Sequence, residues 1–320
     1  MKLFTIIFIA SLVVVGLVFA ETHNYRFSAY QGCIHKDDSS EGFNTLTKKE
    51  ISNNKLQQCL NMPGVSFNGV NTMGIDSPDL SGSILNGSSF VSAKIPGARM
   101  FNVNLEKADF TDASLYRAHI RDADVTSARF HRADLERVNL SDSNISYADF
   151  SNTKLRTSNL NEAQGFKTVF DGADLTDANL GMVNCRQCNF SYTLLNNSFL
   201  TLGNFMDSNF SYSNLSGANL MGATLINSNF SNANLSKVEF NEYTNFKGAY
   251  FNSETVLPFD VHTAFEKGMV FINHDGRYIS TYAKYLELAS AQGIRLRKFL
   301  PEANPQISPK GSLPGKKVRK

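Results

Sequence analysis

The chain has 320 residues, with 31 Lys and Arg against 29 Asp and Glu, and 42% of its residues are hydrophobic. A formal net charge of +2 excludes a protein that binds its partner through a strong overall charge, and the hydrophobic content excludes a chain that is disordered throughout. Trp is absent, Phe reaches 25, and charged residues make up 19%, which is below the usual share for a globular domain.

Residues 1–20 have the pattern of a secretory signal peptide. Lys2 precedes an uncharged apolar run over residues 3–19, and Val18 and Ala20 stand where a signal peptidase requires small residues. The alternative is an uncleaved membrane anchor, because 17 apolar residues reach the lower limit for crossing a bilayer. Cleavage predicts an exported protein, periplasmic or extracellular, in which disulfides persist.

Residues 21–77 are expected to form an N-terminal cap region. Thr47 and Glu50 have capping-box spacing, and a helical stripe of apolar residues follows from Ile51. Cys33 and Cys59 are the candidate disulfide pair that would staple this helix over the first coil of the domain that follows.

A five-residue period runs through the middle of the chain. Of the 33 positions sampled in steps of five from Leu80 to Phe240, 32 are large and apolar, or Cys, and Gly165 is the exception. A small residue usually lies two positions earlier, with Asp or Asn often between the two. Five residues turn a helix by about 500°, which would scatter these residues around every side, and a straight strand would alternate them between two faces. The chain must therefore turn a corner in every unit, so that both the large and the small residue point inward.

Four units make one circuit. Phenylalanine recurs every 20 residues, so four units per turn would stack eight rings in one inward column. The column consists of Phe90, Phe110, Phe130, Phe150, Phe170, Phe190, Phe210 and Phe230. Two further columns are mostly aliphatic, and the fourth, with Gly165 and Cys185, is mixed. The period predicts a square solenoid of about eight coils, roughly 40 Å long.

Units such as ADFTD, ADLER, SNLSG and ANLSK resemble those of the pentapeptide-repeat family over residues 78–250. The resemblance implies an all-β solenoid, namely a right-handed quadrilateral β-helix. A solenoid needs its open ends covered, so small helical caps are expected at both ends. Some relatives inhibit topoisomerases by mimicking DNA, but that role needs a strongly acidic rod in the cytosol, whereas the repeat tract has a net charge of only −3.

Residues 251–300 are expected to form a C-terminal α/β cap, with a turn at His274, Asp275 and Gly276 and a helix from Thr281 to Leu300 that Gly293 could interrupt. Residues 301–320 are rich in Pro, Gly and Lys and are expected to be a disordered basic tail. The tail is either a device that holds the protein on an anionic surface or a solubility tail.

Few residues suggest chemistry. Cys185 and Cys188 have C-x-x-C spacing but occupy inward slots, which favours structural filler over a disulfide across a corner or a redox pair. The six His residues show no metal-ligand spacing, and no cofactor is expected. Four arginines form a candidate surface-binding patch, with a salt-bridged solvated wall as the alternative. These are Arg117, Arg121, Arg132 and Arg137.

The sequence thus predicts an exported, noncatalytic module that acts as a rigid protein-interaction or structural scaffold. Its partner would be another protein or an anionic surface, not a specific nucleic acid. The alternatives are the DNA-mimicking inhibitor and an enzymatic or ligand-binding activity carried by one of the flanking regions.

Overall fold

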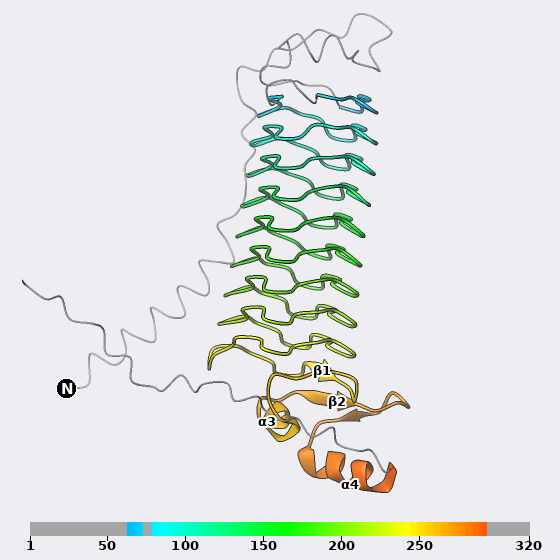
Figure 1. Cartoon of the computed structure of the whole chain (residues 1–320), viewed down its shortest axis with the longest axis vertical. Coiled ribbons are helices and arrows are strands. Elements are labelled where there is room, and N and C mark those ends of the chain that lie inside the picture. The colour runs from blue at the N-terminus through cyan, green and yellow to red at the C-terminus, as the bar shows by residue number, and fades with distance from the viewer. Residues whose placement is uncertain (1–62, 73–77, 293–320) are drawn as a thin grey trace, which may run out of the picture.

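The computed structural model describes residues 63–72 and 78–292, which form a rod that ends in a small α/β module (Figure 1). Several predictions of the sequence lie outside the described residues. These are the signal peptide at 1–20, the capping helix, the Cys33–Cys59 pair and the basic tail at 301–320.

Each five-residue unit contributes one short strand and one corner. The central residue of the strand bridges in parallel to the residue 20 positions away, as Asp109 does to Arg129, while its two neighbours point inward. The corner is a two-residue turn, closed for example by the Ala93 amide donating to the Phe90 carbonyl at 2.9 Å. Four such units return the chain to its starting side, so every strand hydrogen-bonds to the coils above and below it.

The inward phenylalanine column is confirmed. All eight rings are at most 1% exposed. Successive rings lie face to face with centroids 4.5–5.2 Å apart and interplanar angles of 1–11°. Phe67 adds a ninth ring to the stack, 4.5 Å from Phe90. The predicted assignment of large and small inward positions therefore describes the core of the rod.

The coils extend beyond the predicted bounds of 78 and 250. Before residue 78, Ser66 bridges to Ser89, a separation of 23 residues, because the chain carries extra residues there. At the other end Asn234 bridges to Val256, a separation of 22. Residues 63–72 therefore belong to the solenoid and not to a separate cap.

The C-terminal module continues one face of the rod as a three-stranded sheet. Its elements in chain order are β1 (Tyr250–Phe251), α3 (Val261–Glu266), β2 (Val270–Ile272), β3 (Tyr278–Ile279) and α4 (Tyr282–Gln292). β1 bridges to the last coil on one side and pairs in parallel with β2 on the other, and β3 closes the sheet antiparallel to β2. The predicted turn at 274–276 joins β2 to β3, and the predicted helix is observed as α4 up to residue 292.

α3 covers the apolar end of the rod. Its residue Phe265 packs edge-on against Phe251, with ring centroids 5.8 Å apart. Asp260 caps the helix by accepting hydrogen bonds from the backbone amide and the hydroxyl of Thr263, both at 2.9 Å, and these bonds lower the pKa of the Asp260 carboxyl. Its contribution to stability is therefore present above the usual carboxyl pKa and is lost as the pH falls through the lowered value.

The second residue of nearly every corner has a positive φ, a conformation that Gly, Asn and Asp adopt most easily. Thr157 holds this position with φ 53°, although a β-branched side chain is especially strained there. We expect Thr157→Asn to raise the free energy of unfolding by roughly 0.5–1 kcal/mol, measured by urea denaturation. The reverse change at the equivalent corner, Asn152→Thr, should lower it by a similar amount. Equal stability of all three proteins would contradict this reading of the corners.

Candidate interaction surface

The rod has four longitudinal edges, each made of the two-residue turns that follow one inward column. Three of them matter here. The Tyr edge follows the phenylalanine column and includes Tyr192 and Tyr212. The Arg edge follows the next column and includes Arg117 and Arg137. The Met edge follows the third column and includes the turns at 101–102, 121–122, 141–142, 161–162, 181–182, 201–202, 221–222 and 241–243.

The predicted arginine patch is divided among these three edges. Arg117 and Arg137 lie one coil apart on the Arg edge, whereas Arg132 lies on the Tyr edge and Arg121 on the Met edge. Each has local partners. The Arg132 guanidinium donates two hydrogen bonds of 2.7 Å to Asp112, which lower the pKa of that carboxyl, and Arg121 lies over the ring of Phe101 at 4.9 Å. The four arginines therefore do not form a compact cluster with one binding site between them.

Cys185 and Cys188 are joined by a disulfide across a corner, with Cα atoms 5.5 Å apart. The interpretation as unbridged filler is therefore wrong. The five-residue geometry brings a large inward position close enough to the next small inward position to be bridged. Both side chains are at most 1% exposed, so neither sulfur is open to the thiolate attack that a redox pair requires.

One surface cluster combines the three residue types of a catalytic triad in a different order. Ser151 donates a hydrogen bond to Asp149, and its hydroxyl lies 2.8 Å from Nδ1 of His131. In a triad the histidine stands between serine and carboxylate and takes the serine proton. Here the proton of Ser151 is directed at the carboxylate, so His131 is not placed to act as its base. Within residues 63–72 and 78–292, no group of His, Cys, Asp and Glu side chains could hold a metal ion.

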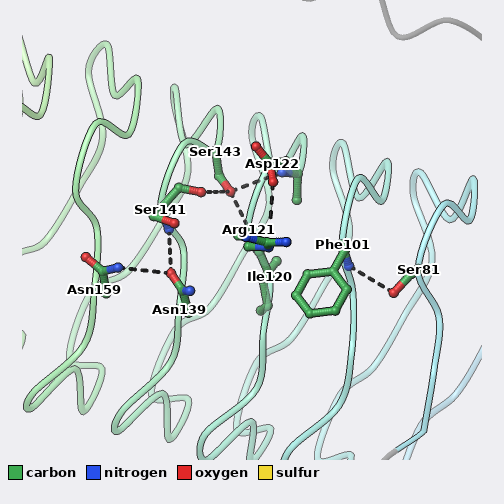
Figure 2. A network of polar contacts seen from close by, with 10 residues as sticks. Ser81, Phe101, Ile120, Arg121, Asp122, Asn139, Ser141, Ser143 and Asn159 are labelled. Carbon is green, nitrogen blue, oxygen red and sulfur yellow. Dashed lines mark hydrogen bonds and ion pairs between the residues drawn. The ribbon is translucent and has the colours of Figure 1, made fainter.

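The recurrent Asn and Asp residues support the coil. Asn159 accepts a hydrogen bond from the amide of Asn161 at 3.1 Å. It also donates one to Asn139 in the preceding coil at 3.3 Å, and Figure 2 shows this second bond. The same pattern joins other coils in side-chain ladders along the rod. These amides are thus occupied by neighbouring coils and contribute to the regularity of the surface.

Inward hydroxyls are also paired with backbone. Ser143 lies inside the rod and donates to the carbonyl oxygen of Ile120 in the preceding coil at 2.7 Å, and it accepts from the amide of Ala123 (Figure 2). Thr168, Thr193 and other inward Ser and Thr residues repeat the bond to the preceding coil. Among the buried side-chain polar atoms of the described residues, only the hydroxyl of Ser158 has no partner.

The second half of the rod presents a nearly uncharged, partly apolar surface. Residues 187–236 contain a single charged side chain, Asp207. Tyr192 and Tyr212 are more than half exposed on the Tyr edge and stack on each other, with ring centroids 4.8 Å apart. Leu194 is exposed on the face beside them. Exposed apolar groups that adjoin one another on a rigid surface are typical of protein-interaction sites.

Comparison with known proteins places the repeat tract in a family. The model described as pentapeptide repeats matches residues 79–112, 97–132, 126–161, 167–202 and 204–241. The chain belongs to the pentapeptide-repeat family. Membership confirms that the rod is a right-handed quadrilateral β-helix, as the resemblance implied. Members of this family are generally noncatalytic.

Solved structures with this fold include HetL, a pentapeptide-repeat protein of heterocyst differentiation regulation from Nostoc sp. strain PCC 7120. It is 22% identical, covers 63% of this chain and 93% of its own, and gives a TM-score of 0.31. QnrB1, a plasmid-mediated fluoroquinolone resistance protein, is 14% identical over 74% of this chain and 100% of its own, with a TM-score of 0.45. A thylakoid-lumen member from Arabidopsis thaliana is 21% identical over 48% of this chain and 83% of its own, with a TM-score of 0.21. No curated protein sequence matches the chain.

The sequence reasoning missed the exposed apolar residues of the pentapeptide-repeat rod. Once the inward positions are assigned, every other position of a unit is outward, so Tyr192, Phe199 and Leu202 could have been marked as apolar side chains on the surface.

None of the described helices is long and apolar enough to cross a membrane.

Proposed function

We propose that this pentapeptide-repeat protein is an exported, noncatalytic scaffold that binds another protein along the side of its rod. The observation that carries the proposal is the exposed Tyr192–Tyr212 pair with Leu194, in a stretch of 50 residues that has one charged side chain. Tyrosine is enriched in protein interfaces, whereas charged residues are depleted from their centres. Backbone hydrogen bonds between coils and the stacking of the two rings hold these residues at fixed spacing, so binding orders few of them and loses little conformational entropy.

Export is supported by the leader at residues 1–20 and places the partner outside the cytosol. In the native host, the protein should be found in an exported fraction, and its intact mass should be that of a chain that begins at Glu21. A full-length chain in the cytosol would contradict export and return attention to the DNA-mimicking alternative.

The interaction itself is tested by a photo-reactive phenylalanine analogue placed at Tyr212 in the native host. We expect one reproducible adduct with another protein in the exported fraction, identified by mass spectrometry, and a loss of about tenfold in its yield when Tyr192→Asn removes the neighbouring ring. Asn occupies several equivalent corners, for example Asn152 and Asn197, so this change keeps the fold. The matched control is Tyr147→Asn on the remaining edge, which should leave the yield unchanged. Adducts that respond equally to both changes would overturn the proposed surface.

A further inference from the structure

A second apolar feature lies on the Met edge, diagonally opposite the Tyr edge. Met182, Leu202, Met221 and Tyr243 occupy this edge in four consecutive coils, and Phe199 lies on the adjoining face. These five side chains are 37–73% exposed, and we call them the apolar ridge. The side chain of Leu202 lies along the edge above Gly222, where a Cβ atom would come within 2.6 Å of it. The side chain of Leu202 therefore reaches onto the next coil of the Met edge.

Two residues of the ridge have a backbone conformation that their residue types disfavour. Met182 and Leu202 hold positive φ angles of 52° and 58°, which cost a residue with a full side chain roughly 1 kcal/mol. Asn102 and Gly222, on the same edge, are the residue types that this conformation favours. Neither Met182 nor Leu202 offsets the cost by burial, since both point largely into solvent. Positive φ is common to nearly every corner of the rod, so the feature that a cover would explain is the exposure of these apolar side chains.

The same edge changes character toward the N-terminal end. The three coils before Met182 carry acids at the equivalent positive-φ position, namely Asp122, Asp142 and Glu162. Asp122 forms an ion pair with Arg121, in which Oδ2 and Nε are 3.8 Å apart; the pair is drawn in Figure 2. Within the described residues, Asp142 and Glu162 make no ion pair. Read from the C-terminal module upward, the Met edge carries the apolar ridge over four coils, with one acid, Glu242, beside Tyr243, and then an acid in each of three coils.

The chain beyond α4 has the complementary order. Residues 294–300 read IRLRKFL and alternate apolar with basic side chains, and residues 310–320 add five more Lys and Arg without an acid. α4 ends at Gln292, below the C-terminal end of the rod (Figure 1). At about 3.3 Å per residue the 28 residues from 293 could span about 90 Å, twice the length of the rod. A strand of chain that leaves α4 and runs up the Met edge would meet the apolar ridge first and the acids afterwards.

We propose that residues 293–320 dock along the Met edge of their own rod. Apolar residues of segment 294–300 cover the ridge, and the later lysines lie near Asp142 and Glu162. The occupant is chosen on the order of the two patches, since a second rod aligned in parallel would bring acids against acids on this edge, and an anionic membrane would be repelled by them. Docking covers the Met edge and leaves the Tyr edge free, so this inference does not depend on the proposed function.

The test uses the full chain with a photo-reactive phenylalanine analogue at Phe299. Irradiation of dilute protein should give intramolecular adducts to the peptides that carry the apolar ridge, mapped by mass spectrometry. The double change Met182→Asn/Leu202→Asn removes two ridge side chains at corners where Asn is favoured, so the rod should stay folded. It should lower the adduct yield by about tenfold. The matched control, Tyr192→Asn/Tyr212→Asn on the Tyr edge, should leave the yield unchanged.

Other outcomes exclude the docking. Adducts between two chains that disappear on dilution would indicate a second copy as the occupant. Adducts elsewhere on the rod, or the same yield in both double variants, would show that the ridge does not hold the tail. If vesicles of anionic lipid bind the wild-type chain and the Met-edge variant equally well, the tail is free in both and the proposal fails.

Discussion

Replacing Phe150 by aspartate is expected to unfold several coils of the rod. The ring is fully buried and stacks between those of Phe130 and Phe170, with centroids 4.7 and 5.2 Å away. Loss of a buried phenylalanine costs about 3–5 kcal/mol, and an unpaired carboxyl in the same space adds the cost of removing it from water. A solenoid is stabilised mainly by contacts between adjacent coils, so the damage spreads to both neighbours.

The change should be measured by thermal unfolding together with hydrogen exchange along the chain. We expect the largest loss of protection in the coils that contain Phe130, Phe150 and Phe170. Phe150→Leu is the matched control, since leucine fills the adjacent columns, and it should cost only about 1–2 kcal/mol. An aspartate variant that melts with the wild-type protein would show that the phenylalanine column is not the core.

The inward columns could be predicted from the sequence because burial in this fold depends on position alone. A unit of five residues with one corner leaves two inward positions, and each recurs at the same place in the next unit. Phe90 and Ala93 follow this rule as closely as Phe230 and Ala233, and all four are at most 1% exposed. The ends were harder to place. Extra residues between Phe67 and Leu80, and again at 241–243, interrupt the period although the coils continue.

The surface was predicted less well, for a physical reason. The five-residue period predicts that Arg117, Arg121 and Arg132 point outward. Whether they form one patch depends on which edge each one occupies and on which residues lie one coil away. Their positions in the 20-residue circuit place the three arginines on different edges. Two of them also contact a residue one coil away: Arg132 binds Asp112, and Arg121 lies over the ring of Phe101. The Cys185–Cys188 bridge depends likewise on the distance across a corner, which the spacing of inward residues does not reveal.

Contacts with neighbouring residues also lead to the second prediction with a large expected effect, which concerns Gly203. This small inward position carries Ala, Ser, Thr, Val or Cys in the units around it, and glycine stands here because of Phe205. A Cβ atom at residue 203 would lie 2.4 Å from Cε2 and 2.9 Å from Cζ of the Phe205 ring. That ring cannot move aside, since it is fully buried and packs edge-on against Phe190 and Phe210 at 5.9 and 5.7 Å.

Gly203→Ala should therefore destabilise the rod by about 1–3 kcal/mol, although alanine is otherwise favoured over glycine. The double change Gly203→Ala/Phe205→Leu should recover most of that loss, because it reproduces the Ala223 and Leu225 pair one coil further along the same column. Urea denaturation of the two single variants and the double variant completes the cycle, with Phe205→Leu alone expected to leave a cavity. If the two changes in the free energy of unfolding are additive, the Phe205 ring is not the reason that residue 203 is glycine. A favourable coupling would show that each coil is packed as a unit, with residues two positions apart chosen together.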